Sequence, residues 1–339
     1  MLEKPDIEDE KIAACLRDEF GLISEGISFL ALGADVNTAV YRCVGQDGKA
    51  YFVKLRRDNF DEMCVAIPKF LRDQGIRQII APIESKSGKL WTSLEDFRLI
   101  LYPFIEGKDG YQIELSARQW LDFGLALKGI HNSKLPSALK GRLIRENYSP
   151  KWREIVLRFL EQVGREDFDD PLAMRTAEFL NEQREGILEL VRRAERLGLA
   201  LLESASELVL CHTDLHAGNI LIDTSGDLYI VDWDNPILAP RERDLMFIGN
   251  AQGFIGFTPE QEESLFYQGY GQTQINAEAL AYYRYERIIE DIAAFCEQLF
   301  QTDGSIEDRE QGFRYLSSNF LPGNTIDLAY RADQSSGFG

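Results

Sequence analysis

The stretch that decides the fold reads His212-Thr213-Asp214-Leu215-His216-Ala217-Gly218-Asn219, and Ile230-Val231-Asp232-Trp233-Asp234 follows it. The residues between them fit a hairpin, since two strand-like runs, Ile220-Leu221-Ile222 and Leu228-Tyr229-Ile230-Val231, flank the turn sequence Thr224-Ser225-Gly226-Asp227. A hairpin places Asn219 and Asp232 at adjacent strand ends. Both side chains could then reach one metal ion.

This order of side chains is the one that phosphoryl transfer of the protein-kinase type requires. One aspartate must lie against the attacking hydroxyl, and Asp214 is the candidate. An asparagine and a second aspartate must hold Mg²⁺, which makes Asn219 and Asp232 the candidate catalytic metal ligands. Each residue alone is better explained as a turn or cap residue, because Asp and Asn favour such positions. The three together, on one hairpin, indicate a kinase site.

A lysine in the middle of a predicted strand supplies the nucleotide side of this site. The run Tyr51-Phe52-Val53-Lys54-Leu55 would bury the stem of Lys54 and direct its ammonium group towards the phosphates of ATP. Arg56 and Arg57 are nearby candidates, but the position after the preceding loop favours Lys54. We expect Glu62 to pair with Lys54, although Glu62 fits equally well as a first-turn charge of a helix.

Two further segments are expected to contact the nucleotide. Residues 32–38 join the first two predicted strands, so the backbone around Gly33 and Asn37 would hold phosphate oxygens. This loop lacks the Gly-x-Gly-x-x-Gly pattern of protein kinases, and as a bare hairpin it would be unremarkable. Adenine would lie against the segment between the lobes and bond to the backbone of Pro103, Phe104 and Ile105.

The second half of the chain supplies candidates for the acceptor side. Asp234 lies two residues beyond the metal aspartate, and a predicted late helix places Tyr283, Arg287 and Glu290 on one face. Such a face suits a polyhydroxylated cationic ligand, and it suits packing against the catalytic core equally well. The candidate substrate residues are Asp214, Asp234, Tyr283, Arg287, Glu290 and Asp291.

Residues 212–219 and 230–234 resemble the aminoglycoside phosphotransferase and choline kinase family, whose catalytic loop reads His-x-Asp-x-His-x-x-Asn. The resemblance implies an O-phosphotransferase that uses ATP and Mg²⁺. Three longer stretches, 148–154, 238–249 and 282–291, resemble the spectinomycin phosphotransferases within this family. They imply an aminocyclitol or aminoglycoside acceptor, with a hydroxyl of spectinomycin preferred, and a role in antibiotic resistance.

The predicted elements fit a bilobal, protein-kinase-like α+β fold. Residues 1–105 combine short apolar strands with one main helix near 61–74, which predicts a nucleotide-binding lobe with a small antiparallel sheet. Residues 106–331 are mostly helical apart from the strands of the catalytic hairpin, which predicts a catalytic and substrate-binding lobe. Residues 332–339 are polar and glycine-rich, and we expect a disordered tail.

Composition limits the classes of partner. A formal net charge of −19 over 339 residues argues against nucleic acid and is compatible with a cationic small-molecule substrate. No apolar run is long enough to span a bilayer, and the N-terminal residues lack the order of a signal peptide, so no membrane partner is expected. Five scattered cysteines without metal-ligand spacing predict a cytoplasmic protein with reduced thiols.

Two alternatives stay open. A kinase for choline, a sugar or another amino alcohol would carry the same catalytic residues. A protein Ser/Thr kinase is disfavoured because no Ala-Pro-Glu segment follows Asp232. A non-catalytic kinase-like binding module is disfavoured because Lys54 and all three catalytic positions are present.

Overall fold

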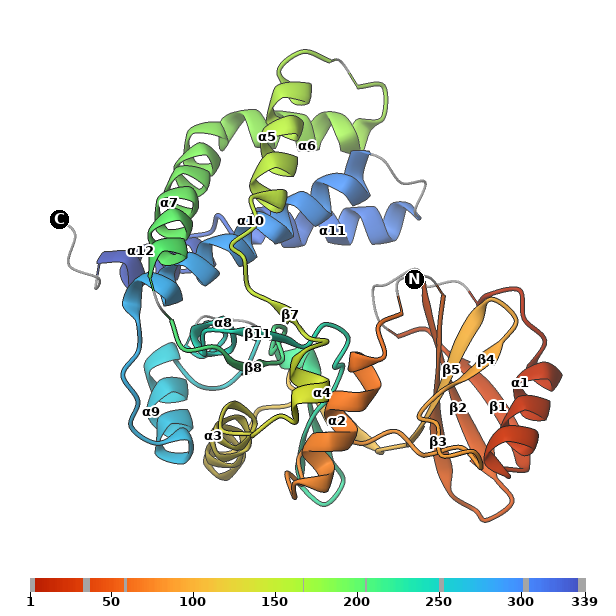
Figure 1. The fold of residues 1–339 in the computed structure, drawn as a ribbon. Coiled ribbons are helices and arrows are strands. Elements are labelled where there is room, and N and C mark those ends of the chain that lie inside the picture. The colour runs from red at the N-terminus through yellow and green to blue at the C-terminus, as the bar shows by residue number, and fades with distance from the viewer. Residues whose placement is uncertain are drawn as a thin grey trace.

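The computed structural model of the chain describes residues 4–32, 37–57, 60–166, 168–204, 206–249, 253–300 and 305–334. In these ranges an antiparallel sheet with few helices is followed by a larger, mostly helical part (Figure 1). This arrangement confirms the predicted α+β fold class, with a sheet lobe followed by a helical lobe.

The first lobe is built on a five-stranded antiparallel sheet with strand order β1-β2-β3-β5-β4. Its strands are β1 (Ser24–Leu30), β2 (Thr38–Gly45), β3 (Ala50–Arg56), β4 (Thr92–Leu94) and β5 (Phe97–Pro103). One face of the sheet buries an apolar core that includes Tyr41, Val53, Leu55 and Leu99. The helix α1 (Asp9–Cys15) and the π-helical turn η1 (Leu16–Phe20) cover that core. Because side chains alternate along β3, Lys54 lies on the opposite face.

The helix α2 (Met63–Asp73) lies between the sheet and the second lobe (Figure 1). Its residues Met63, Ile67 and Leu71 belong to the apolar core of the second lobe. Cys64 and Val65 pack in the other direction, in a small cluster with a residue of β5. The helix therefore connects the two lobes and is not simply part of the sheet lobe.

The catalytic hairpin lies in a second sheet of order β10-β9-β6. It consists of β6 (Gly107–Asp109), β9 (Ile220–Asp223) and β10 (Leu228–Ile230). A third sheet of order β7-β11-β8 combines β7 (Ile144–Arg145), β8 (Val209–Cys211) and β11 (Ile237–Ala239). The expectation that only the hairpin is β-structure in this half was therefore too narrow. The extra strands have two or three residues each, which is too short for a clear alternating pattern.

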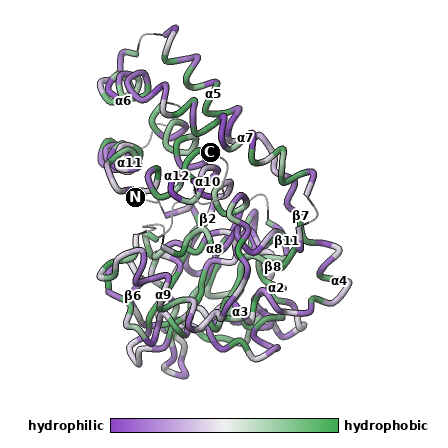
Figure 2. Tube along the Cα trace, turned by 90° about the vertical axis from the view of Figure 1, so that its left-hand side faces the viewer, coloured by the Kyte–Doolittle hydropathy of each residue, from purple (hydrophilic) through white to green (hydrophobic). Residues whose placement is uncertain are grey.

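Helices form the rest of the second lobe, and α10 packs against α5, α7, α11 and α12 (Figure 1). In Figure 2, hydrophilic and hydrophobic stretches alternate along α5 and α6, as expected of helices with one buried face. The helices are α3 (Ala117–His131), α4 (Ser137–Lys140), α5 (Lys151–Val163), α6 (Pro171–Glu182), α7 (Arg184–Glu203), α8 (Glu242–Leu245), α9 (Pro259–Tyr270), α10 (Ala277–Phe300), α11 (Ile306–Ser318) and α12 (Thr325–Gln334).

The end of the chain differs from the expectation. Residues 332–334 form the last turn of α12, and Asp333 is buried. Its carboxylate accepts hydrogen bonds from Arg193 and from the Tyr285 hydroxyl. The expected tail thus began too early, because composition does not show these long-range partners, and residues 335–339 lie outside the described ranges. Among the described helices, none is both long and apolar enough to cross a membrane.

Candidate active site

The catalytic loop connects β8 to the hairpin, and the pairing of β9 with β10 brings its ends together. Ile220 lies opposite Ile230 in the register. Asn219 ends a short 3-10 turn, and its carbonyl accepts a hydrogen bond from the Val231 N–H at 3.0 Å. Asn219 and Asp232 therefore lie at adjacent strand ends.

A buried carboxylate fixes the backbone of this loop. Asp244 accepts hydrogen bonds from the N–H groups of His212 (2.9 Å) and Thr213 (2.7 Å), and its side chain also contacts His131. Burial would raise the pKa of Asp244, but its contact with His131 outweighs this and lowers it. Thr213 and Asp232 both adopt a left-handed backbone, with φ of 79° and 64°. Such conformations persist where surrounding contacts hold them, and here Asp244 holds the first.

The candidate base Asp214 is held by several groups at once. Its Oδ1 accepts a hydrogen bond from Arg287 at 2.8 Å, and its Oδ2 lies 3.5 Å from Nε2 of His216. Burial would raise the pKa of Asp214, but His216 and Arg287 outweigh burial and hold the pKa well below its usual range. Asp214 is therefore a carboxylate at neutral pH, as a residue that accepts a hydroxyl proton must be.

His216 orients the loop. Its Nδ1 accepts a hydrogen bond from the Gly218 N–H at 3.0 Å, so neutral imidazole carries its hydrogen on Nε2, towards Asp214. The Tyr111 hydroxyl lies 3.0 Å from the same Nδ1, and the two rings are stacked. Sequence reasoning missed Tyr111, because nothing in the local pattern around it distinguishes it from other loop tyrosines.

Lys54 reaches across from the sheet lobe to the hairpin. Its Nζ lies 2.8 Å from Oδ1 of Asp232 and 2.7 Å from Oδ1 of Asp234. Burial would lower the pKa of Lys54, but the two carboxylates outweigh burial and raise it, so the side chain stays a cation. The structure thus brings Lys54 to the residues that sequence reasoning assigned to the metal and the acceptor.

The expected pair of Lys54 and Glu62 is not formed. The carboxylate of Glu62 accepts hydrogen bonds from Arg142 (2.8 Å) and from Nε1 of Trp91 (3.2 Å). The hydrogen bond from Arg142 is also the main reason why the pKa of Glu62 is lowered. Glu62 is the N-cap residue of α2 and its carboxylate is partly exposed, so the helix-end interpretation describes it better.

The other residues expected to bind nucleotide are only partly described. Gly33 lies outside the described residues. The carbonyl of Asn37 accepts a hydrogen bond from the Arg57 N–H. Pro103 ends β5, and the Phe104 N–H donates to the Ala50 carbonyl at 3.2 Å, so this N–H is not free for adenine.

For Ile105, the described part of the chain shows no acceptor for the backbone N–H. Of the three segment residues, Ile105 therefore offers the free donor. The Phe104 N–H is engaged because β3 extends its pairing with β5 by one further hydrogen bond.

The expected substrate residues on the late helix α10 differ in their surroundings. Arg287 and Asp291 lie next to Asp214, whereas Tyr283 is packed in the core. Arg287 lies between two carboxylates. Its Nε is 3.1 Å from Oδ1 of Asp291, and its NH1 donates a hydrogen bond to Oδ1 of Asp214. Burial, together with the neighbouring Glu290, raises the pKa of Asp291 to about 6 even though Arg287 opposes the shift. Tyr283 is fully buried against other tyrosines, so the core-packing interpretation holds for it and the substrate expectation was wrong.

The side chains fit a divalent cation that prefers oxygen ligands. The amide nitrogen of Asn219 donates to the Asp214 carbonyl at 2.8 Å, which leaves the amide oxygen as a ligand. The Asp232 side chain is 47% exposed and shares only Oδ1 with Lys54. Two hard oxygen donors at adjacent strand ends are a donor set that suits Mg²⁺.

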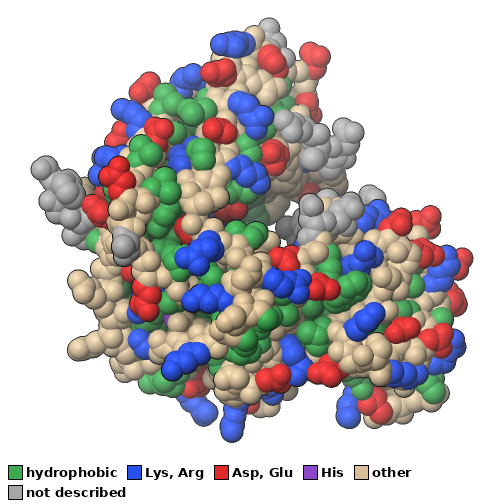
Figure 3. All heavy atoms as spheres, in the orientation of Figure 1, with side chains coloured by type: hydrophobic (Ala, Val, Ile, Leu, Met, Phe, Trp, Pro, Cys, Tyr) green, Lys and Arg blue, Asp and Glu red, His purple; other side chains and the backbone are tan. Residues whose placement is uncertain are grey.

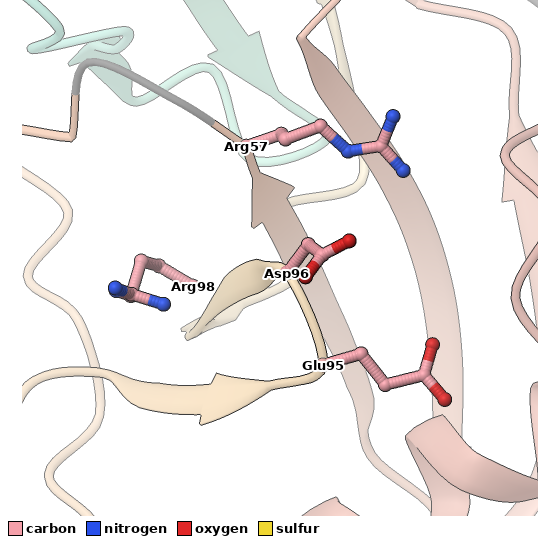
Figure 4. Close-up of a pocket in the computed structure, with 4 residues that line it drawn as sticks. All are labelled: Arg57, Glu95, Asp96 and Arg98. Carbon is pink, nitrogen blue, oxygen red and sulfur yellow. The ribbon is translucent and has the colours of Figure 1, made fainter.

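The surface is hollowed between the upper helices and the sheet lobe, and acidic and basic side chains meet below this hollow (Figure 3). A separate hollow on the sheet lobe is lined by Arg57, Glu95, Asp96 and Arg98. In Figure 4 the Arg98 side chain points away from Arg57 and Glu95. Glu95 is paired with Lys11 at 2.6 Å. These side chains do not converge, so the second hollow is not a candidate site.

Comparisons with known proteins bear on the family and the fold of the chain. The model of a phosphotransferase enzyme family matches residues 28–283. A crystal structure of a spectinomycin phosphotransferase in complex with ADP and spectinomycin is 36% identical, with a TM-score of 0.90 over 97% of this chain and 100% of that one. An AMP-bound structure of spectinomycin phosphotransferase is also 36% identical, with a TM-score of 0.84 over 95% and 98% of the chains.

A microcompartment-associated aminopropanol kinase shares only the fold, at 13% identity and a TM-score of 0.63 over 98% of this chain and 99% of that one. No match was found among the curated proteins.

Proposed function

We propose that this chain, which belongs to the phosphotransferase enzyme family, transfers the γ-phosphoryl group of ATP to a hydroxyl group of spectinomycin. One observation carries the catalytic part of the proposal. Lys54 of the sheet lobe lies 2.8 Å from Asp232 of the hairpin, and Asn219 and Asp214 are hydrogen-bonded to each other on the adjoining loop. These are the groups that phosphoryl transfer of the kinase type uses.

The roles follow from the positions of the side chains. Asp214 orients the acceptor hydroxyl and takes its proton as the oxygen attacks phosphorus, while the β–γ phosphate bond breaks and ADP leaves. Lys54 holds phosphate oxygens of the nucleotide. Asn219 and Asp232 would hold Mg²⁺, which neutralises phosphate charge when bound. Ile105 offers its backbone N–H to adenine.

The acceptor part of the proposal rests on similarity and on charge. A protein that is 36% identical over its whole length has been solved with spectinomycin. Spectinomycin carries secondary amines that are cationic near neutral pH, and such groups need a carboxylate partner when they are buried. Glu290 and Asp291 on α10 are the candidates. Asp291 shares the single cation Arg287 with Asp214, whereas Asp234 is held by two cations, Lys54 and Arg56. Inactivation of the antibiotic in the cytoplasm, where ATP is available, would be the biological role.

The test is a reaction of purified protein with ATP, Mg²⁺ and one acceptor at a time. We expect ADP formation that depends on spectinomycin, one added phosphoryl group by mass, and loss of the reaction when a chelator removes Mg²⁺. Choline, ethanolamine and simple sugars are the comparison acceptors. Turnover of choline or a sugar without turnover of spectinomycin would leave the kinase proposal standing and overturn the acceptor.

A further inference from the structure

We propose that Arg56 is a positioning residue of the phosphotransferase site, which neutralises Asp234 so that Lys54 is free to engage the nucleotide. The inference rests on the proposed function and adds a residue that the kinase pattern does not contain. Sequence reasoning treated Arg56 only as a competitor of Lys54 for the same role.

The strand geometry places Arg56 beside Lys54. β3 is a central strand, paired with β2 on one side and β5 on the other, so its register is fixed from both sides. Residues two apart on a strand point to the same face. NH1 of Arg56 lies 3.1 Å from Oδ1 of Asp234, and Nζ of Lys54 lies 2.7 Å from that same oxygen.

Both cations are buried, which makes their pairing matter. The side chains of Lys54 and Arg56 are 12% and 10% exposed, and that of Asp234 is 22% exposed. Charges so far from water are costly unless an opposite charge lies close to them. In the described residues, the cations Lys54 and Arg56 both lie against Asp234, and Lys54 also lies against Asp232.

The position of Glu62 explains why the pairing of Arg56 with Asp234 matters for Lys54. In kinases a helix glutamate orients the strand lysine. Here Glu62 is bound to Arg142 and Trp91, so the carboxylates of the hairpin orient Lys54. When Lys54 turns to the phosphates it gives up Asp234. With Arg56 in place Asp234 keeps a cation. Without Arg56 the lysine could leave only by exposing an unpaired buried carboxylate.

The measurable consequence is weaker use of the nucleotide. In Arg56→Gln, Lys54 should be retained by Asp234, which lowers the affinity for ADP with Mg²⁺ by roughly tenfold or more. KM for ATP should rise by a similar factor, while KM for the acceptor should stay within about twofold. Arg56→Lys keeps the charge and should recover most of the affinity.

Arg57 provides the matched control. It is the next residue, and its guanidinium lies over the Phe97 ring at 4.6 Å. Arg57→Gln should therefore keep the wild-type ADP affinity. Melting temperatures of all variants without nucleotide show whether a loss comes from misfolding instead.

Calorimetric titration of ADP with Mg²⁺ is the deciding measurement because it does not depend on the acceptor. Wild-type ADP affinity in Arg56→Gln, or an equal loss in Arg57→Gln, would overturn the inference, and so would a failure of Arg56→Lys to recover affinity. If wild-type protein binds ADP but does not phosphorylate spectinomycin, only the acceptor proposal fails. If wild-type protein does not bind ADP, both proposals fail.

Discussion

At the scale of single residues, the charge on Asp214 depends on one near neighbour and on one group that is far away in the chain. Arg287, which is 73 residues later, and His216 keep Asp214 ionised in spite of its burial. The same contacts fix the direction of its carboxylate. In the proposed reaction, Asp214 would orient the acceptor hydroxyl and receive its proton late, when the proton is most acidic.

Asp214→Asn should lower kcat by about 10²–10⁴-fold, the usual contribution of a positioned base. The amide has the same shape, so ADP affinity and melting temperature should stay close to wild type. Steady-state rates with ATP and spectinomycin, together with an ADP titration, are the measurements. Turnover near the wild-type rate would remove Asp214 from the catalytic role.

A second residue-scale prediction concerns Glu262, a buried carboxyl on α9. Burial raises its pKa from the usual 4.5 to about 7, and in the described structure its Oε2 has no hydrogen-bond partner. The folded state then holds a proton that the unfolded state releases. Stability should fall as pH rises from about 4.5 to 7, by roughly 1 kcal/mol per pH unit for this group.

Glu262→Gln removes this titration without a large change in volume. Thermal unfolding of both proteins from pH 5 to pH 8 is the measurement, and the difference between them isolates the group. We expect the variant to gain stability relative to wild type as pH rises. A constant difference over this range would show that Glu262 does not titrate in the folded protein.

At the scale of elements, α3 and α9 approach each other closely at two glycines. A Cβ atom added to Gly124 would lie 2.2 Å from the Phe266 carbonyl oxygen, and one added to Gly269 would lie 1.9 Å from the Leu121 carbonyl oxygen. Both obstacles are backbone atoms, which cannot turn aside. The two glycines therefore set the distance between the helices.

Gly124→Ala should destabilise the protein by at least about 1–3 kcal/mol, because the helices must separate to accept the methyl group. Gly129→Ala, also in α3, is the control. A Cβ there meets only the tip of Ile76 at 3.4 Å, so alanine should be neutral or stabilising by up to about 1 kcal/mol. Urea unfolding of both variants gives the comparison, and equal effects would contradict the close approach.

At the scale of the whole molecule, the two lobes have separate apolar cores, and α2 belongs mainly to the core of the helical lobe. Met63, Ile67 and Leu71 are its contribution. The helix that carries Glu62 at its start should therefore keep its structure as long as the helical lobe does. Exchange protection of its backbone amides should therefore follow the stability of the helical lobe, although α2 comes before β4 and β5 in the chain.

Hydrogen exchange under native conditions tests this coupling. In increasing denaturant, amides of α2 should lose protection together with those of β9 and β10, because cooperative units follow packing. Amides of β1 and β2 should behave as a separate group. Loss of α2 protection together with β1 and β2 would place the helix in the sheet lobe instead.

The sequence by itself determined the hairpin, the kinase-like fold and the family. These depend on order and spacing within short segments, so a local pattern specifies them. The placement of Asn219 next to Asp232 needed only the hairpin register. The charges that surround these residues did not follow from local patterns.

Only the tertiary structure decided how the charged side chains pair. Lys54 meets Asp232 across 178 positions of sequence, and the expected partner Glu62 binds Arg142 instead. Helical spacing alone could not separate Arg287, which reaches Asp214, from Tyr283, which is buried. The physical reason is that an ion pair requires two side chains to be close in space, and for distant segments the packing of the lobes sets that distance.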